Sequence, residues 1–136
     1  SWTFFEREKL TVPKRINKNK DLDTIKIGFA DIKIERVAPS FRKSNTDCFG
    51  QYLSRENKIE IQKEVDGIDY ANTLLHEILH AIIYLSSLNA DGGCLKEEDN
   101  EEQVVNSITN WLMGVFRDNP KVLEIIKEKA NALQKS

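Results

Sequence analysis

The chain has 136 residues, of which 40% are hydrophobic and 31% charged, and its formal net charge at pH 7 is -2. This size and composition are typical of a single core, so we expect one domain spanning residues 1–136. The small net charge predicts neither nucleic acid nor a membrane as a partner. A basic cluster near the N-terminus lacks interleaved aromatic residues, and we interpret it as solvated surface. Its members are Lys9, Lys14, Arg15, Lys18 and Lys20.

The apolar runs and the cysteines predict the cellular compartment of the protein. No apolar run is long and suitably flanked for a signal peptide or a membrane span, so we expect a cytoplasmic protein. Cys48 and Cys94 have no CxxC spacing, and we interpret them as free thiols in a reducing compartment.

An arm and a hairpin are the first elements predicted along the chain. We expect residues 1–10 to form a helix or arm that covers apolar surface, because they include Trp2, Phe4 and Phe5. Apolar and polar residues then alternate at 25–27 and 32–37 around a Gly-Phe-Ala-Asp turn. This period of two predicts a β-hairpin with one covered face.

A second hairpin follows. Residues 49–53 and 58–61 have the composition of strands, and the polar segment 54–57 between them has that of a turn. The chain therefore predicts a small sheet before any long helix begins.

The segment His76-Glu77-Ile78-Leu79-His80 carries the strongest functional signal. Residues four apart share one face of a helix, so both imidazoles would point at one spot with Glu77 beside them. Neutral imidazoles at this spacing can bind zinc, while the intervening carboxylate acts on a metal-bound water. The apolar flanks predict a helix from about residue 70 to residue 88 that is buried almost all round. Burying these three polar groups costs free energy unless they are paired or bind a metal.

A catalytic zinc site needs a third protein ligand and a coordination position open to water. The chain contains only two histidines, so the third ligand must be a carboxylate or a cysteine. After a turn at residues 89–93, residues 97–106 open a second amphipathic helix, whose apolar stripe should pack against the motif helix. The stripe comprises Val104, Val105, Ile108, Trp111, Leu112, Val115 and Phe116. A carboxylate one turn before it would face the histidines.

Glu101 and Glu102 compete for the role of third ligand. We favour Glu102, which lies four residues before Asn106, a polar residue that could hold a ligand histidine by its second ring nitrogen. Glu101 remains the alternative, because it precedes Val104 and Val105 by three and four residues. No spacing rule supports a thiolate contact from Cys94.

The motif His-Glu-x-x-His, followed about twenty residues later by Glu102-x-x-Val105-Asn106, resembles the gluzincin pattern, in which an Asp or Asn stands four residues after a ligand glutamate. The size and arrangement are similar to the ImmA/IrrE-like peptidases and the short metallopeptidase-like proteins of phages and prophages. This resemblance covers roughly residues 25–123. It implies a zincin-like peptidase with Zn²⁺ as cofactor and a peptide or protein as substrate, without saying which one.

The resemblance also implies a place for the substrate. In small gluzincin-like proteins the strand at this position, here residues 49–53, is often the edge of the sheet beside the site. An exposed edge can pair with an extended peptide through main-chain hydrogen bonds, which predicts substrate contacts at Phe49, Gly50, Gln51 and Tyr52. A plain structural hairpin is the alternative.

Two functions stand against each other. In a zinc endopeptidase, Glu77 would take a proton from the zinc-bound water and pass it to the leaving amine. Gluzincins usually add a Tyr or His that donates to the oxyanion, and here the candidates are Tyr52, Tyr70 and Tyr84, although Tyr84 fits a core position better. The alternative is a non-catalytic binding or regulatory module stabilised by zinc. Glu77 argues against it, because a structural site has no use for a base.

The last helix completes the predicted fold. Asn119 before Pro120 is a good cap and first-turn pair, and apolar residues then recur at helical spacing. They are Val122, Leu123, Ile125, Ile126, Ala130 and Leu133. We therefore expect an α+β fold, in which a small antiparallel or mixed sheet packs on about three helices as in a minimal zincin-like domain, with zinc between the second and third helices.

Overall fold

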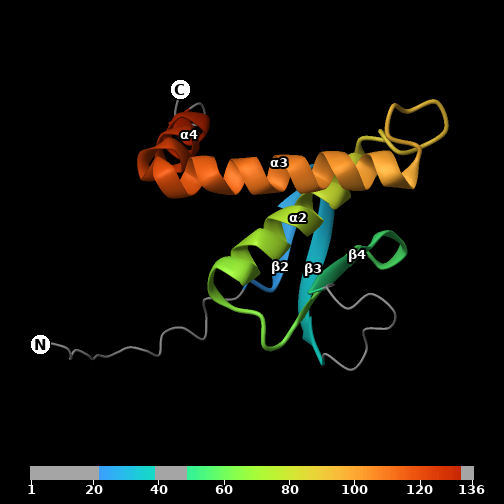
Figure 1. Cartoon of the computed structure of the whole chain (residues 1–136), viewed down its shortest axis with the longest axis horizontal. Helices are drawn as coiled ribbons and strands as arrows, with labels where there is room; N and C mark the ends of the chain where they lie inside the picture. The colour runs from blue at the N-terminus through green and yellow to red at the C-terminus, as the bar shows by residue number, and fades with distance from the viewer. Residues whose placement is uncertain (1–21, 39–48, 133–136) are drawn as a thin grey trace, which may run out of the picture.

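The computed structural model describes residues 22–38 and 49–132 (Figure 1). The elements in chain order are β2 (Thr24–Ile27), β3 (Ala30–Val37), β4 (Gly50–Leu53), the short 3-10 helix η3 (Ser54–Glu56), β5 (Lys58–Gln62), α2 (Gly67–Leu85), α3 (Glu98–Asp118) and α4 (Pro120–Ala132). The expected α+β fold is confirmed. The predicted arm at residues 1–10, the basic cluster, Cys48 and Leu133 lie outside the described residues.

The four strands form one mixed sheet in the order β2-β3-β5-β4. Strands β2 and β3 are the first predicted hairpin, joined by a tight turn at Gly28, whose φ of 60° a glycine adopts without strain. Strands β4 and β5 are the second hairpin, also antiparallel, and β3 pairs with β5 in parallel. Among the described strands β4 therefore stands at an edge of the sheet, as expected for residues 49–53.

One face of the sheet carries the core, because apolar and polar residues alternate along the strands. Helix α2 lies on this face and contributes Leu74, Ile78 and Leu85 to the packing. The buried residues of the cluster are Ala30, Ile32, Ile34, Ile59, Ile61 and Val65. The opposite face is charged: the Lys58 ammonium lies 3.3 to 3.4 Å from carboxylate oxygens of Glu35, Glu56 and Glu60.

Arg36 fixes the start of α2 relative to the sheet. Its Nη1 donates to the backbone carbonyls of Gln62, Lys63 and Val65, each at 3.0 Å. Its guanidinium also lies 4.5 Å from the centre of the Tyr70 ring, in the first turns of α2. The central strand β3 thereby holds the segment that leads from β5 into the motif helix.

Helix α2 begins and ends three residues before its predicted bounds. Asp66, in an extended conformation, precedes Gly67, whose φ is +61°. At the other end Ser87 has a φ of 67°, and the Leu88 N–H donates to the Ile83 carbonyl at 3.1 Å. The left-handed residue at Ser87 and this backbone bond close the last turn, so the chain leaves the helix before residue 88.

Helix α3 crosses only the C-terminal half of α2 (Figure 1). Ile83, Leu95 and Val105 are buried at the crossing, with Leu79 and Val104 packed against them. The faces of α2 and α3 that point away from the sheet and from this crossing leave apolar side chains exposed among the described residues. Two predictions are therefore wrong: α2 is not buried all round, and the stripe on α3 does not pack against α2 along its whole length. The exposed apolar side chains include Ile68 and Ile82 on α2 and Ile108, Trp111 and Val115 on α3.

Helix α4 turns away at the far end of α3 and packs chiefly against it (Figure 1). The side-chain amide of Asn119 donates to the Val115 carbonyl at 3.0 Å and so caps the end of α3. None of the described residues of α4 is buried. No helix in the described part of the chain is long and apolar enough to cross a bilayer.

Candidate metal centre

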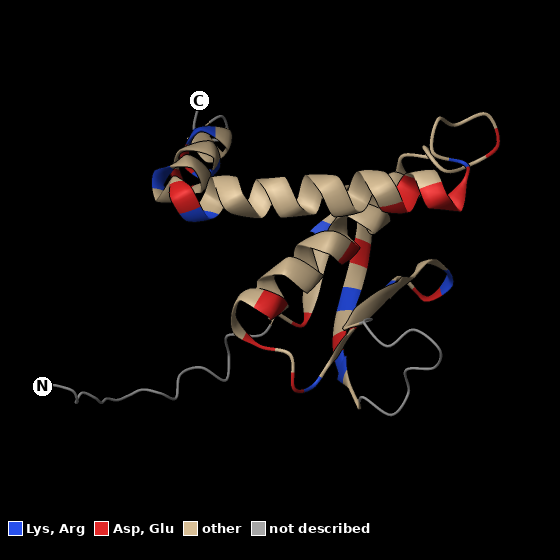
Figure 2. Ribbon diagram, viewed as in Figure 1, with Lys and Arg blue, Asp and Glu red and all other residues tan. Residues whose placement is uncertain are grey.

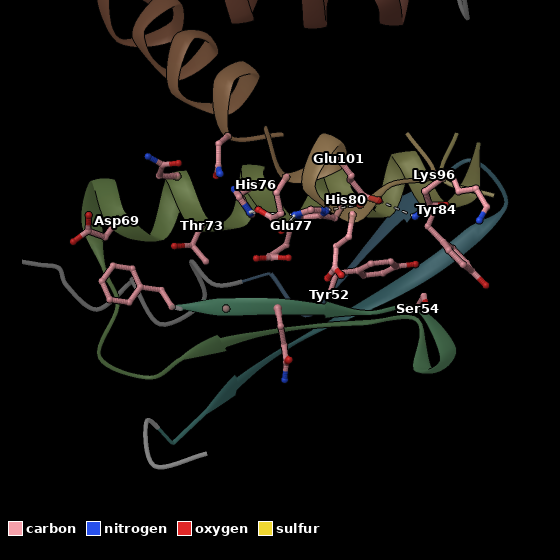
Figure 3. A pocket seen from close by; sticks show the side chains of 18 residues that line it. Tyr52, Ser54, Asp69, Thr73, His76, Glu77, His80, Tyr84, Lys96 and Glu101 are labelled. Atoms are coloured by element: carbon pink, nitrogen blue, oxygen red, sulfur yellow. Dashed lines mark hydrogen bonds and ion pairs between the residues drawn. The ribbon is translucent and has the colours of Figure 1, made fainter. Parts of the chain in front are cut away.

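A cleft of about 910 Å³ opens between α2, the start of α3 and strand β4 (Figure 3). The candidate site residues come from three separate segments of the sequence, and the fold places all of them on the wall of this one cleft. They are Phe49, Gly50, Gln51 and Tyr52 from β4 and its approach, His76, Glu77 and His80 from α2, and Glu101, Glu102 and Asn106 from α3. Figure 2 shows acidic residues gathered at the start of α3, and three of them, Glu98, Glu101 and Glu102, line the cleft.

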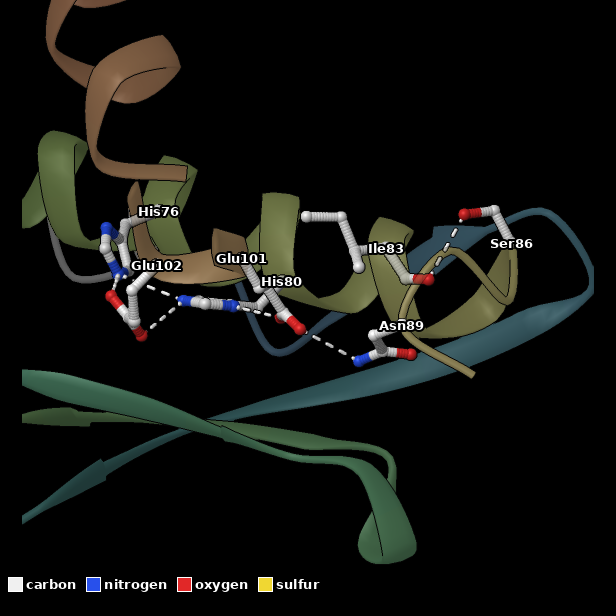
Figure 4. Close-up of polar contacts among 7 residues, drawn as sticks. All are labelled: His76, His80, Ile83, Ser86, Asn89, Glu101 and Glu102. Atoms are coloured by element: carbon white, nitrogen blue, oxygen red, sulfur yellow. Dashed lines mark hydrogen bonds and ion pairs between the residues drawn. The ribbon is translucent and has the colours of Figure 1, made fainter. Parts of the chain in front are cut away.

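Three ligand atoms converge on one point in this cleft (Figure 4). The Nε2 atoms of His76 and His80 are 3.2 Å apart. The Glu102 carboxylate lies 3.1 Å from Nε2 of His80 and 3.8 Å from Nε2 of His76. Ligand atoms about 2.1 Å from a tetrahedral zinc ion are separated from one another by about 3.3 Å. The two imidazole nitrogens match this spacing, whereas the two Glu102 contacts are made by different oxygens, and one atom from each residue lies within 4.8 Å of the others.

The electrostatics of His76 favour the form that binds metal. Burial lowers the pKa of this imidazole, and the neighbouring His80 lowers it further, while Glu102 acts in the opposite direction. A neutral imidazole keeps a lone pair for a metal ion. The environment of His76 thus suits a ligand better than a cation.

Glu101 and Glu102 stand on opposite sides of the His80 ring (Figure 4). The Glu101 carboxylate lies 2.6 Å from Nδ1 of His80, whereas Glu102 lies by Nε2. The Glu101 side chain is 13% exposed and that of Glu102 is 50% exposed. Because the two ring nitrogens point in opposite directions, a metal ion held by both Nε2 atoms could be reached by Glu102 but not by Glu101.

Asn106 does not have the contact expected of it. It lines the cleft, but it makes no hydrogen bond to either histidine within the part of the chain that the structure describes. The prediction is wrong for His80, whose second nitrogen is held by Glu101. The reason is geometric: Asn106 lies a full turn beyond Glu102 on α3, while Glu101 is directly beside His80.

Asn89 was missed by the sequence analysis. Its side-chain amide donates to the second oxygen of Glu101 at 3.0 Å, so it belongs to the same chain of contacts as His80. Residue 89 was read only as part of a turn. The sequence offers one signal for this contact: Asn89 lies just after the motif helix and before the helix that carries Glu101.

Glu77 projects from α2 into the cleft toward β4 (Figure 3). It is only 6% exposed, and it makes no hydrogen bond or ion pair with any of the described residues. Burial, together with the nearby Glu102, raises the pKa of Glu77 to about 7, although His80 acts to lower it. A carboxyl group that titrates near neutral pH and has no hydrogen-bond partner in segments 22–38 and 49–132 is well suited to exchange a proton with a bound molecule.

Two of the three candidate tyrosines line the cleft. Tyr52 and Tyr84 do so, and their rings meet edge to face with centroids 6.2 Å apart. The Tyr52 hydroxyl is buried without a hydrogen-bond partner among the described residues, and burial, followed by Tyr84, raises its pKa. Tyr70 packs instead against the sheet core and Arg36.

Strand β4 approaches α2 closely at Gly50. A Cβ atom at this position would lie 2.7 Å from the Glu60 carbonyl oxygen and 2.8 Å from Cγ2 of Thr73. Only glycine allows the edge strand to lie this near the motif helix. The Gln51 side chain donates to Glu60 at 2.9 Å across the pair of strands, so this residue faces the cleft through its backbone.

Comparisons with known proteins give no match. No family model fits the chain, and neither curated proteins nor solved structures match it. The likeness to gluzincins therefore stays an expectation from the motif. Cys94 is an exposed free thiol that does not line the cleft, and so it is no ligand in this arrangement.

Proposed function

We propose that the chain is a zinc-dependent peptidase in which His76, His80 and Glu102 hold Zn²⁺ and Glu77 is the general base. The observation that carries the proposal is the juxtaposition of two features in one cleft. Three candidate ligand atoms lie within 4.8 Å of one another, and a buried carboxyl group that pairs with none of the described residues stands beside them. A structural zinc site would have no use for the second feature.

The chemistry follows from the position of Glu77. Zinc, when bound, supplies a positive charge that makes water more acidic and polarises a peptide carbonyl. A carboxylate oxygen of Glu77 accepts the proton that water loses as its oxygen attacks the carbonyl carbon. The same carboxyl group then gives this proton to the amine nitrogen as the C–N bond breaks. His80 and Glu101 stay in their hydrogen bond throughout and keep the imidazole oriented.

The substrate in this proposal is an extended peptide that adds to the edge strand β4. Main-chain hydrogen bonds at residues 49–52 would align it along the cleft, so that one carbonyl lies opposite Glu77. The Tyr52 hydroxyl is a donor that no described residue pairs with, and it could serve the carbonyl oxygen. A cytoplasmic location and the exclusion of nucleic acid as a partner remain predictions from composition.

Glu77→Gln tests the proposal, because it keeps size and polarity but removes the proton acceptor. We expect the variant to bind zinc like the wild type while cleavage falls by roughly 10²- to 10⁴-fold. Denatured proteins, a peptide library and the chain itself serve as substrates, scored by mass spectrometry, with zinc content measured by elemental analysis. Asp99→Asn is the matched control, since Asp99 is an exposed acid of α3 that does not line the cleft.

Three results would decide against this proposal in different ways. Equal cleavage by wild type and Glu77→Gln would remove Glu77 as the base. Zinc binding without cleavage of any substrate would favour a zinc-stabilised binding or regulatory module. Failure of the wild type to bind zinc would overturn the metal site itself.

A further inference from the structure

A chain of three side chains runs from the connector between α2 and α3 to the candidate metal site (Figure 4). The Asn89 amide donates to one oxygen of Glu101 at 3.0 Å, and the other oxygen lies 2.6 Å from Nδ1 of His80. Glu101 and His80 each expose only 13% of their side chains. The contacts are therefore shielded from competing water, and each oxygen of the carboxylate has its own partner.

The short contact determines which ring nitrogen of His80 carries a proton. A carboxylate only accepts hydrogen bonds, so Nδ1 must donate to Glu101. A neutral imidazole with its proton on Nδ1 has its lone pair on Nε2. That lone pair points to His76 and Glu102, where the ligand atoms converge.

The connector holds Asn89 in place. Leu95 is buried against Ile83 and Val105, and its N–H donates to the Leu88 carbonyl at 2.8 Å. A Cβ at Gly93 would lie only 2.2 Å from the Leu88 carbonyl oxygen. The backbone at Gly93 is therefore in direct contact with the backbone at Leu88. The backbone on either side of Asn89 is therefore tied to the helix crossing, and its amide meets Glu101 in a fixed position.

We propose that Asn89 and Glu101 are a positioning pair that locks His80 in its metal-binding tautomer and orientation, and so sets the affinity of the site for zinc. This inference rests on the proposed function for the identity of the metal. It gives the connector a role in the site, and it assigns adjacent glutamates to different tasks: Glu102 binds the metal and Glu101 orients a ligand.

Zinc affinity is the first measurement, by competition with a chelator of known affinity. Residues that orient a metal-ligating histidine typically contribute 10- to 100-fold, so Glu101→Ala should weaken zinc binding by about this factor. Glu102→Ala should weaken it by more, because it removes a ligand. Glu101→Gln keeps an acceptor oxygen for Nδ1 and should recover part of the loss.

Asn89 offers a more specific comparison. Asn89→Ala removes the donor, and we expect zinc affinity to fall by less than for Glu101→Ala. Asn89→Asp has nearly the same shape but places a second carboxylate against Glu101, so it should bind zinc more weakly than Asn89→Ala. Asn100→Ala is the control, since Asn100 is exposed on the same helix as Glu101 and its side chain has no contact with the site.

The second measurement reads the tautomer directly. The chain contains only two histidines, so a long-range ¹H–¹⁵N correlation spectrum shows just four ring nitrogens. At a pH where the His80 ring carries a single proton, we expect the zinc-free wild type to hold it on Nδ1, and Glu101→Ala to give a mixture of tautomers. Circular dichroism and thermal melts identify any variant that fails to fold, in which case Glu101→Gln and Asn89→Asp carry the test.

The outcomes separate this inference from the peptidase proposal. Unchanged zinc affinity in a folded Glu101→Ala, or a wild-type His80 protonated on Nε2, would overturn the positioning pair. Zinc binding that depends on the pair, without any cleavage, would leave the pair standing and remove the peptidase. If the wild type binds no zinc, the proposed function fails, and the histidine spectrum of the zinc-free protein alone decides on the pair.

Discussion

The two halves of α3 have similar sequence patterns but different environments. In the first half Val105 is fully buried against α2, and Glu101 is held by His80 and Asn89. In the second half Trp111 is 80% exposed, and α4, which packs there, has no buried residue. The difference arises because α2 and α3 meet at an angle and part after one crossing.

This contrast shows what holds the candidate site in place. Carboxylates and imidazoles keep a fixed geometry only where packing restricts their rotamers and excludes water. The crossing does both for His80 and Glu101, whose side chains are 13% exposed. The outer half of α3 has the same periodicity but packs chiefly against α4, which buries none of its own residues, and it therefore provides a comparison inside the same helix.

Removing zinc should have the largest effect, and it should be confined to the crossing. At a free zinc concentration about 1,000 times the dissociation constant, a bound ion stabilises the folded state by about 4 kcal/mol. Addition of a chelator should lower the melting temperature and speed hydrogen exchange at the α2–α3 crossing. Amides of α4 should exchange as before. An equal change in both regions would mean that the two halves of α3 unfold as one unit.

The pH dependence of the zinc-free protein tests the burial of Glu77. Its pKa rises from 4.5 to about 7 on folding, so the folded state binds the proton more tightly. The resulting stability is fully present below about pH 4.5 and is lost as the pH rises through 7, a loss of about 3 kcal/mol.

Urea unfolding of the zinc-free wild type and of Glu77→Gln at a series of pH values measures this loss. The variant cannot ionise, so its free energy of unfolding should fall less between pH 5 and pH 8 than that of the wild type. Parallel pH profiles for the two proteins would show that Glu77 is solvated, which would contradict its burial in the structure.

A pair of substitutions compares the two halves of α3 directly. Val105→Ala should cost roughly 2 kcal/mol of unfolding free energy, because it leaves a cavity at the crossing. Trp111→Ala removes a much larger side chain but should change stability by less than about 0.5 kcal/mol. Chemical denaturation of both variants gives the comparison. A large loss for Trp111→Ala would mean that another part of the chain, or a second copy, covers this face.

The sequence predicted the elements of the fold better than their burial. Period-two alternation predicted both hairpins, because a strand on one face of a sheet needs it. Helical spacing likewise predicted α2, α3 and α4. It could not say that Trp111 lies beyond the crossing, because the angle between two helices depends on side chains from both of them and not on the periodicity of either.

The candidate site likewise contains residues that local geometry places together and residues that only tertiary contacts bring in. His76, Glu77 and His80 belong to one turn of one helix, so local geometry alone places them together. Glu102 required the correct facing of a second helix, and the alternative Glu101 was left open for that reason. Asn89 contacts the site only through Glu101, a tertiary contact that leaves no pattern in the sequence.

The hydrogen bonds from Arg36 to the backbone after β5 have a consequence for the order of folding. They join positions 26 to 29 residues apart in the chain and depend on the parallel pairing of β3 with β5. Contacts between distant residues form slowly, because the intervening loop must first be closed, whereas a helix forms within about a microsecond. The histidine motif can thus form a helix early in folding. Its packing against the sheet, which creates the cleft, comes only late. During refolding, helical circular dichroism should recover before the protein regains its ability to capture zinc.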